Sequence, residues 1–297
     1  MLMVTGSFAE SLIQPLHPVG GVDRQKAKLG RMLFFDPTLS RDSTISCASC
    51  HKADRGWADE RVVSLGVYGR KGRVNSPTVL NAVYNFKQFY NGRADTLKEQ
   101  AKGPLHEAFE MDMDDALLQE RLQANSEYKK LFHALYKDGI TVDNVVDVIA
   151  EFEKRLTTSN AKFDRYLKSE ATLTQEEKQG YKLFRVYGCI TCHNGMNVGG
   201  NSFQKLGIVI AYENCYDDRF AITKRTFDKC VYKVPTLRNI EKTAPYFHDG
   251  SAKTLREAIK KMAYHNLGFE LEDDDIKSIE AFLKTLSAEL DPEVLND

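Results

Sequence analysis

Cys47-Ala48-Ser49-Cys50-His51 and Cys189-Ile190-Thr191-Cys192-His193 are two copies of the pattern Cys-x-x-Cys-His. Two cysteines at this spacing can bond to both vinyl groups of one haem, and the histidine that follows then lies beneath the ring and binds its iron. A structural zinc site would need four closed ligands from paired motifs, and a redox dithiol has no need of the histidine. The pattern therefore predicts two covalently bound haem c groups, with one histidine on each iron.

The composition is typical of a globular protein that is long enough for two domains. The 297 residues carry a formal net charge of −1, so the chain has no basic surplus that would favour nucleic acid or an anionic membrane surface as a partner. No apolar run approaches the length needed to span a membrane. We therefore expect neither a nucleic-acid partner nor a membrane span.

The cysteines also indicate a cellular compartment. In bacteria, haem is attached to Cys-x-x-Cys-His outside the cytoplasm, where disulfides also persist, and this predicts a periplasmic protein. Residues 1–7 lack the basic region and hydrophobic stretch of a secretion signal, so we expect a mature chain whose leader has been removed. Cys215 and Cys230 bracket a polar loop, and a disulfide between them is favoured over two free thiols. We expect this loop to have little influence on the active site.

The sequence pattern around the first haem motif recurs around the second. Residues 30–34 (Gly-Arg-Met-Leu-Phe) precede the first motif and residues 180–184 (Gly-Tyr-Lys-Leu-Phe) precede the second, and each stretch is typical of an amphipathic helix. A capping box from Thr174 to Glu177 predicts where the second of these helices begins. Each motif is followed by another helix with an apolar face at helical spacing. The two faces are Val146, Ile149, Phe152 and Leu156, and Ile276, Ile279, Phe282 and Leu286.

This recurrence predicts two cytochrome c-like haem domains joined near residues 157–173. The N-terminal domain is expected at residues 20–165 and the C-terminal domain at residues 166–297. Strand patterns are weak throughout, so the predicted fold class is all-α with long connecting loops.

Two further residues bear on whether the protein is an electron carrier or an enzyme. A carrier needs both axial positions of its haems filled, whereas a peroxidase needs one open iron, an acid-base group above it and a source of electrons. Met262 follows the second motif, where a thioether ligand would raise the potential of the haem, although a lone helical methionine is more often core. Glu110 is a carboxylate in an apolar and aromatic stretch, although such a residue is more often exposed. From the residues alone, both interpretations stay open.

The chain resembles the bacterial di-haem cytochrome c peroxidases along most of its length. The matching stretches, in the family's order, are residues 29–36 with the first haem motif, 75–82, 91–94, 99–101, 103–104, 234–239 and 245–250. The resemblance implies reduction of hydrogen peroxide to water, with electrons arriving from a small cytochrome c or cupredoxin at the C-terminal haem. That haem would be held by His193 and Met262. The N-terminal haem, on His51, would be the site where peroxide binds.

The same resemblance implies roles for four residues near the N-terminal haem. Gln100 and Glu110 would line the peroxide pocket, where a carboxylate can take a proton from one peroxide oxygen and return it to the other. Phe89 would shield the iron from solvent. Tyr90 stands where many members of the family carry a tryptophan between the haems. A tyrosine can also pass an electron, but its oxidation is coupled to loss of the phenolic proton.

The resemblance also implies a calcium ion between the domains. Its ligands would be the side chain of Asn75 and the backbone carbonyls of Thr243 and Pro245, and such all-oxygen ligation suits a hard cation. An asparagine in a proline-rich turn is otherwise typical of turn chemistry. Relatives often work as dimers, so a homodimer is expected as well.

One departure from the family changes the expected resting state. Many members carry a removable histidine ligand before the segment that corresponds to residues 73–77, whereas this chain has Val67 at that place. Valine cannot bind iron, so we expect an open iron on His51. The alternative ligand would be another side chain of residues 66–72, with Tyr68 the nearest, or His106.

Two other functions remain as alternatives to a peroxidase. A di-haem oxidase that modifies a protein substrate, as in the maturation of methylamine dehydrogenase, would carry tyrosine in place of Met262. A plain di-haem electron carrier would turn over no peroxide. Peroxide turnover with a reduced cytochrome separates a peroxidase from both.

Overall fold

The computed structural model describes residues 12–296, and residues 1–7, where we expect no secretion signal, lie outside this range. The α-helices are α1 (Arg24–Phe34), α2 (Cys47–Cys50), α3 (Leu97–His106), α4 (Asp115–Ala124), α5 (Ser126–Leu135), α6 (Val142–Arg155), α7 (Lys162–Leu167), α8 (Gln175–Val186), α9 (Arg219–Thr223), α10 (Leu255–Met262), α11 (Asp273–Lys284) and α12 (Glu293–Asn296). Two short strands, β1 (Phe203–Lys205) and β2 (Val231–Lys233), pair antiparallel.

Short helical turns occupy much of the remaining chain. They are the 3-10 turns Pro37–Leu39, Ala53–Arg55, Val67–Gly69, Ala82–Tyr84, Cys189–Thr191, Thr226–Asp228 and Ile240–Lys242, and the π-helical turn Ala263–Leu267. In the described part of the chain, no helix is long and apolar enough to cross a membrane.

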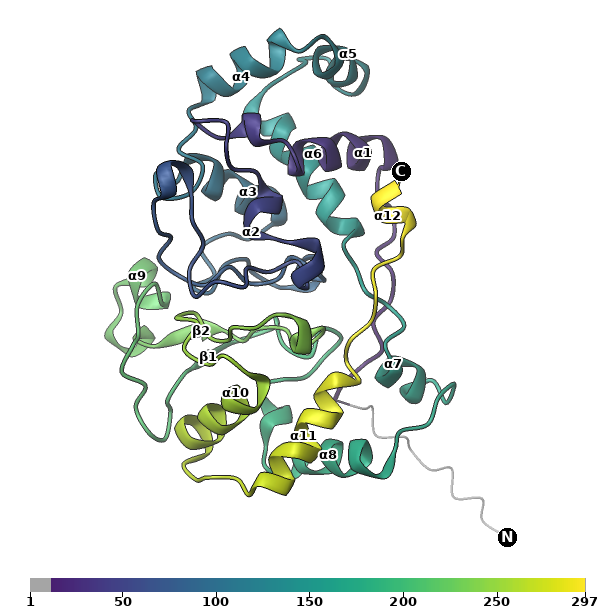
Figure 1. The fold of residues 1–297 in the computed structure, drawn as a ribbon, viewed down its shortest axis with the longest axis vertical. Coiled ribbons are helices and arrows are strands. Elements are labelled where there is room, and N and C mark those ends of the chain that lie inside the picture. The colour runs from purple at the N-terminus through teal and green to yellow at the C-terminus, as the bar shows by residue number, and fades with distance from the viewer. Residues whose placement is uncertain (1–11, 297) are drawn as a thin grey trace.

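The molecule has two lobes that repeat one helix pair. In Figure 1 the upper lobe contains α1 to α6 and the lower lobe contains α8 to α11. α1 packs against α6, and α8 packs against α11. Asp23 caps α1 by accepting hydrogen bonds from two backbone N–H groups, and Thr174 and Glu177 form the predicted capping box of α8. Both predicted apolar faces are buried, and the mostly helical chain with two short strands confirms the predicted all-α class with long loops.

Each lobe has its own apolar core, built around aromatic rings. In the upper lobe, the ring centroids of Phe34 and Phe152 lie 5.3 Å apart, and Trp57 packs beside them. In the lower lobe, Phe282 of α11 contacts Phe163 with ring centroids 5.0 Å apart. The strand pair lies on the side of the lower lobe that faces the upper lobe (Figure 1).

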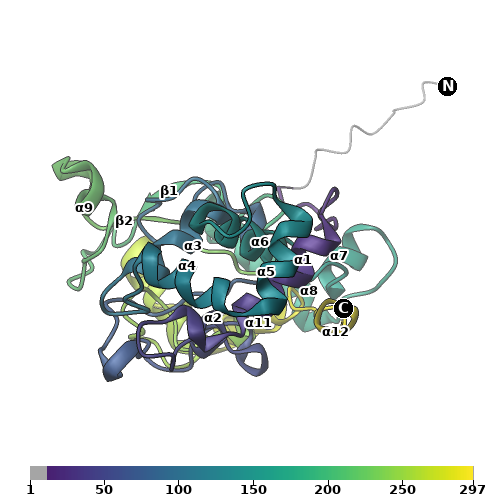
Figure 2. The same cartoon turned by 90° about the horizontal axis from the view of Figure 1, so that it is seen from above.

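Each end of the chain packs into the lobe that is formed mainly by the opposite half of the sequence. Ile13, near the N-terminus, is buried in the core of the lower lobe, whereas Val294 of α12 is buried in the core of the upper lobe. The linker residue Phe163 also belongs to the lower core. Figures 1 and 2 show both terminal segments running along the same side of the molecule as α7. The division of the chain at residues 165 and 166 stays a prediction, and the packing of both ends ties the lobes together.

Buried polar contacts hold the linker in place between the lobes. Arg238 donates hydrogen bonds of 2.8 and 2.9 Å to the two carboxylate oxygens of Asp164, and both side chains are fully buried. Thr158 accepts a hydrogen bond from Asn81 in one lobe and donates one to Asn239 in the other. These contacts fix the orientation of the two lobes, and so they fix the space between their haem motifs.

Candidate active site

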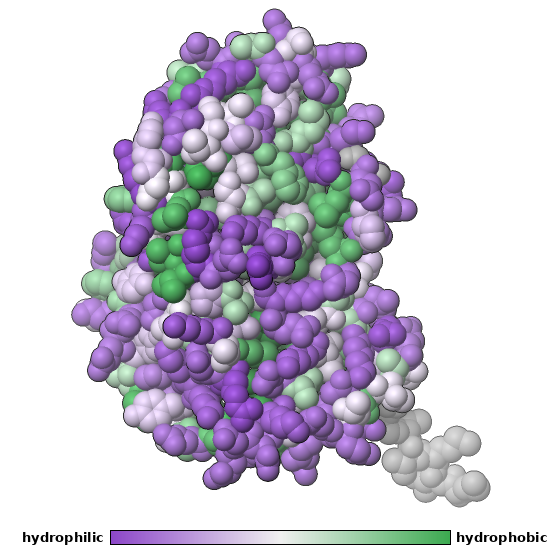
Figure 3. All heavy atoms as spheres, viewed as in Figure 1, coloured by the Kyte–Doolittle hydropathy of each residue, from purple (hydrophilic) through white to green (hydrophobic). Residues whose placement is uncertain are grey.

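One cavity of about 920 Å³ runs from the first haem motif across the lobe boundary to the second. Both cysteine pairs and both motif histidines line it. Ordinary ligand pockets have volumes of about 300–1,000 Å³, so this cavity lies at the upper end of the range. In Figure 3 the surface is mostly polar, and apolar side chains gather where the two lobes meet. Both haem motifs therefore face one shared cavity at the domain interface.

The first motif meets the requirements of haem attachment. Cys47 and Cys50 are the first and last residues of α2, and both line the cavity. Nδ1 of His51 lies 3.3 Å from the carbonyl oxygen of Trp57, and a hydrogen bond donated there leaves Nε2 free for an iron. Burial lowers the pKa of His51, which favours the neutral ring that binds metals.

The second motif offers the same set of haem-attaching residues, although Nδ1 of His193 is buried without a hydrogen-bond partner. Cys189 and Cys192 line the other end of the cavity, and burial lowers the pKa of His193 to about 4. Met262 is the last residue of α10 and lines the same cavity. A histidine and a thioether are the axial pair of many electron-transfer haems. The residues therefore fit a haem at this motif, and ligation by Met262 stays a prediction.

The predicted peroxide-pocket residues come together beside the first motif. Gln100 lies on α3, Glu110 follows this helix, and Phe89 lies in the turn before it; all three line the cavity. Phe89 has a left-handed backbone, with φ of 66°. A Cβ atom on Gly103 would lie 2.9 Å from Cζ of Phe89, so glycine allows this ring to pack against α3.

Glu110 has the electrostatic setting of an acid-base group. Burial raises the pKa of its carboxyl to about 6, while the charge of Arg93 lowers this pKa and the charges of Glu107 and Asp217 raise it. Its backbone oxygen accepts a hydrogen bond of 2.8 Å from the N–H of Val67. A carboxyl that titrates this close to neutral pH can both accept and return a proton during turnover.

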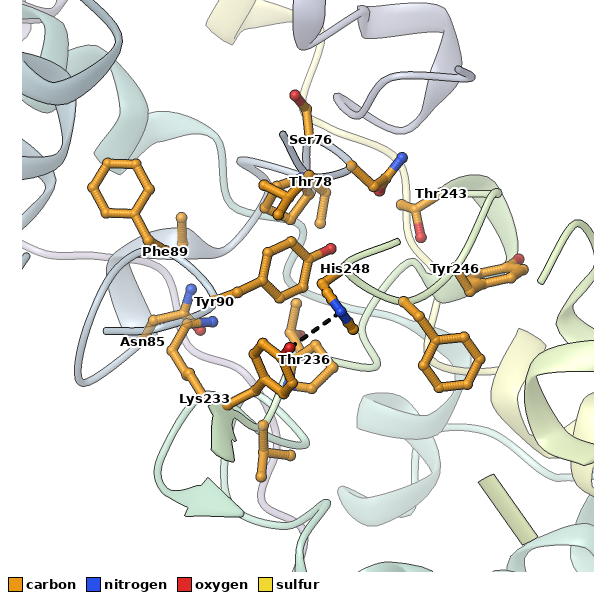
Figure 4. Close-up of a pocket in the computed structure, with 18 of the residues that line it drawn as sticks. Ser76, Thr78, Asn85, Phe89, Tyr90, Lys233, Thr236, Thr243, Tyr246 and His248 are labelled. Atoms are coloured by element: carbon orange, nitrogen blue, oxygen red, sulfur yellow. Dashed lines mark hydrogen bonds between the residues drawn. The ribbon is translucent and has the colours of Figure 1, made fainter. Parts of the chain in front are cut away.

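Tyr90 lies at the lobe boundary, and its backbone oxygen accepts a hydrogen bond of 2.7 Å from the N–H of Lys233 in the other lobe. In Figure 4 its ring lies between Phe89 and His248, and the centroids of the Tyr90 and His248 rings are 6.4 Å apart. His248 stacks on Tyr232 and is hydrogen-bonded to its hydroxyl at 3.1 Å, the dashed line of Figure 4. Burial raises the pKa of Tyr90, so the phenol is protonated at neutral pH and its oxidation would release this proton.

Two buried charged residues of the cavity are not singled out by the sequence analysis. Burial lowers the pKa of Lys233 on β2 to about 8 and raises the pKa of Glu153 on α6 to about 8. Oε2 of Glu153 is buried without a hydrogen-bond partner. The one available signal for Lys233 is its place directly before residues 234–239. Glu153 comes directly after Phe152, a residue of the apolar face of α6. A charged residue at this position of an amphipathic helix is ordinarily expected to face solvent.

The three predicted calcium ligands line the cavity at the lobe boundary. Asn75 is buried, and Nδ2 of its side chain donates to the backbone oxygen of Arg61 at 2.9 Å, which leaves Oδ1 as its free oxygen. Thr243 and Pro245 come from the other lobe. The described residues contain no cluster of three or more His, Cys, Asp or Glu side chains that could hold a metal ion. The calcium site implied by the family resemblance stays a prediction.

The alternative ligands for the first haem lie away from the cavity. Val67 is buried, while the side chain of Tyr68 is 60% exposed and lies under the guanidinium of Arg70. Nε2 of His106 is hydrogen-bonded to Asp115 at 2.6 Å near the surface. Neither Tyr68 nor His106 lines the cavity, so the structure gives no support to either residue as an iron ligand.

Two c-type haem motifs facing one cavity across a domain interface define a di-haem cytochrome. Residues 24–172 match the family model described as di-haem cytochrome c peroxidase, and residues 177–287 match that of cytochrome c. The chain belongs to the di-haem cytochrome c peroxidase family, which confirms the resemblance seen in the sequence, and it binds two haem c groups.

Similar proteins agree with this assignment. The chain is 42% identical to a cytochrome c551 peroxidase of Nitrosomonas europaea, over 95% of this chain and 85% of that protein. It is also 42% identical to the cytochrome c peroxidase Ccp of Escherichia coli, over 94% of this chain but only 62% of that protein. Among solved structures, a MauG-like protein associated with microbial copper homeostasis superposes with a TM-score of 0.83 at 28% identity, covering 98% of both chains.

Proposed function

We propose that this cytochrome c peroxidase works in the periplasm and divides its reaction between two haems. His51 would hold the haem that supplies the iron for reduction of hydrogen peroxide to water. His193 and Met262 would hold the haem that supplies a redox centre for electrons from a small cytochrome c or cupredoxin, and Tyr90 would lie on the electron path across the lobe boundary.

An asymmetry between two corresponding helices carries this proposal. α3 and α10 each begin after a threonine, Thr96 or Thr254, whose hydroxyl accepts a hydrogen bond from the third N–H of the helix. Eight residues after its cap, each helix has a residue that lines the cavity: Met262 in α10 and Pro104 in α3. A thioether can bind iron and a proline ring cannot. α10 therefore offers a ligand at the point where α3 offers none.

The residues beside the first motif suit proton transfer to peroxide. When bound, haem c supplies the redox-active iron that delivers electrons to the substrate. Glu110 takes the proton from one peroxide oxygen and returns it to the other, which then leaves as water. The amide of Gln100 orients peroxide by hydrogen bonding without changing its charge. The ring of Phe89 keeps bulk water from the pocket.

The chain also offers a counter-charge for the haem carboxylates. Lys233 is buried in the cavity, and among the described residues no carboxylate pairs with it. A buried ammonium without a partner is costly. The carboxylates of a haem are the anions that would lie in this cavity, so we assign Lys233 to them.

Calcium, the domain division and the oligomeric state remain parts of the proposal. A calcium ion held by Asn75, Thr243 and Pro245 would link one lobe to the other and so fix the distance between the haems. The division into residues 20–165 and 166–297 gives each domain one haem motif. The homodimer implied by the family is checked by sedimentation of the haem-loaded protein.

Steady-state turnover tests the proposed function. The haem-loaded protein should oxidise a reduced mono-haem cytochrome c when peroxide is added. Glu110→Gln should keep both haems but lower this rate by about two to four orders of magnitude, the usual contribution of an acid-base group. Glu120→Gln, an exposed residue on α4, is the matched control and should behave like the wild type. Absence of peroxide-dependent oxidation in the wild type, or a fully active Glu110→Gln variant, would overturn the proposal.

A further inference from the structure

The loop closed by the disulfide between Cys215 and Cys230 reaches from the lower lobe to the edge of the peroxide pocket. Asp217 lies in this loop, and its Oδ1 accepts a hydrogen bond of 3.1 Å from Nδ2 of Asn91 in the upper lobe. Its Oδ2 lies 3.7 Å from Nη1 of Arg93. The predicted disulfide is present. The contacts of its loop with Asn91 and Arg93 argue against the expectation that the loop has little influence on the active site.

The backbone on both sides of Asp217 is held in place. Asp218 caps α9 through the N–H of Ala221, and its other carboxylate oxygen accepts a hydrogen bond of 2.7 Å from the N–H of Cys230. On the preceding side, the ring of Tyr216 packs on that of His248 with centroids 4.9 Å apart. The Asp217 carboxylate is thus presented to the upper lobe in one defined direction.

The partner of Asp217 lies directly on a pocket residue. Cζ of Arg93 lies 3.4 Å from the centroid of the Phe89 ring, within the range of a cation–π contact. Nη1 of Arg93 also approaches Oδ1 of Asn91 at 3.4 Å. Burial lowers the pKa of Arg93, and the nearby charge that most opposes this effect is that of Asp217. A partly buried guanidinium in this position depends on such a counter-charge.

Arg93 and Glu110 line the same cavity, where the charge of Arg93 acts on the Glu110 carboxyl. The charged side chains that act on Glu110 are Arg93, Glu107 and Asp217, and of these only Arg93 is a cation. The other charged or titratable groups that interact with Asp217 or Arg93 are Arg73, His248, Tyr216 and Tyr232.

We propose that Asp217 is a positioning residue of the peroxide site. The disulfide-closed loop carries Asp217 across the domain interface, and Asp217 acts on Glu110 by holding Arg93 against Phe89. The inference rests on the proposed function of Glu110 and deepens it. It makes a residue of the electron-accepting domain part of the peroxide pocket of the other domain.

A double-mutant cycle on the haem-loaded protein tests this inference. The pH profile of kcat/KM for peroxide is measured for the wild type, Asp217→Asn, Arg93→Gln and the double variant. Absorption spectra of the ferric protein, titrated with pH in the absence of peroxide, give a second readout that needs no turnover. Glu213→Gln removes the same charge from an exposed position two residues before Cys215 and is the matched control.

If Asp217 acts through Arg93, Asp217→Asn shifts the acidic limb of the pH profile by at least about half a pH unit. The same substitution then has no effect on the limb in the Arg93→Gln background. The control, Glu213→Gln, leaves the limb in place. An unchanged profile in Asp217→Asn overturns the inference. An equal shift in both backgrounds also overturns it, because Asp217 would then act by its charge alone. A wild type without peroxide turnover would instead overturn the proposed function.

Discussion

Gly30 of α1 lies directly against the carbonyl oxygen of Val148 in α6: a Cβ atom at Gly30 would be 1.7 Å from that oxygen. The lower lobe repeats this relationship, since a Cβ atom at Gly180 of α8 would be 1.8 Å from the carbonyl oxygen of Ser278 in α11. In each lobe, the glycine lets one helix rest on the backbone of its partner. The sequence repeat at residues 30–34 and 180–184 therefore marks two equivalent helix crossings.

Gly30→Ala should destabilise the upper lobe. The added methyl group meets backbone rather than a flexible side chain, so the helices must move apart, and we expect a loss of about 3 kcal/mol, at the upper end of the usual cost of overpacking. The measurement is the midpoint of thermal unfolding of the haem-loaded protein. Gly20→Ala is the control, since a Cβ atom there meets nothing within 4 Å. Equal midpoints for the two variants would show that the crossing is not tightly packed.

Helix positions could be predicted from the sequence because they depend on local signals. The capping box at Thr174 and the apolar faces of α6 and α11 are complete within a few turns of chain. The exchange of the chain ends could not be predicted in this way. Ile13 and Val294 are ordinary apolar residues, and only the folded chain shows which of the two cores each one enters.

The residues of the candidate site likewise fall into those that local motifs identify and those that only tertiary contacts identify. His51, His193 and Glu110 stand in contiguous motifs, and the structure places all three along one cavity. Asp217 carries no such signal and Lys233 only borders the motif at residues 234–239, because the importance of both comes from burial and from contacts across the domain interface. Such contacts join residues that are far apart in the chain, and neither periodicity nor spacing reports them.

The rate of peroxide reduction should fall at acid pH in a way that reports Glu110. The pKa of its carboxyl is raised to about 6 by burial, and only the ionised form can accept a proton from peroxide. Below pH 6, kcat/KM should therefore drop about tenfold per pH unit, whereas above pH 7 it should be flat. The profile is measured with a donor whose own oxidation is independent of pH. The same acidic limb in Glu110→Gln would assign it to another group.

Met262→His should lower the potential of the C-terminal haem. Imidazole favours ferric iron more than a thioether does, so we expect a drop on the order of 200 mV, within the roughly 0.8 V that axial ligands span. Met262→Leu, which offers no ligand, should instead give a high-spin haem. Potentiometric titration followed by optical spectra gives both results. Unchanged potentials and spectra in both variants would mean that Met262 is only a packing residue.

Lys233→Met should lower the potential of at least one haem. The cavity would lose a buried positive charge that favours the added electron, and a loss of about 1.4 kcal/mol corresponds to about 60 mV for a one-electron couple. The control is Lys253→Met, which removes an exposed lysine of the same lobe that does not line the cavity. If the two variants have the same potentials, Lys233 does not pair with a haem carboxylate.

The oxidised protein should bind peroxide at the haem on His51 without prior reduction. Pro104 stands in α3 where Met262 stands in α10, Val67 is a buried residue that cannot bind iron, and the side chains of Tyr68 and His106 lie outside the cavity. No iron ligand is therefore expected from any of these positions, and the iron should be five-coordinate or bound to water. Electron paramagnetic resonance of the fully oxidised protein should show one high-spin haem whose signal changes when peroxide is added. Two low-spin signals would mean that another side chain binds this iron, and peroxide reduction would then require a step that removes it.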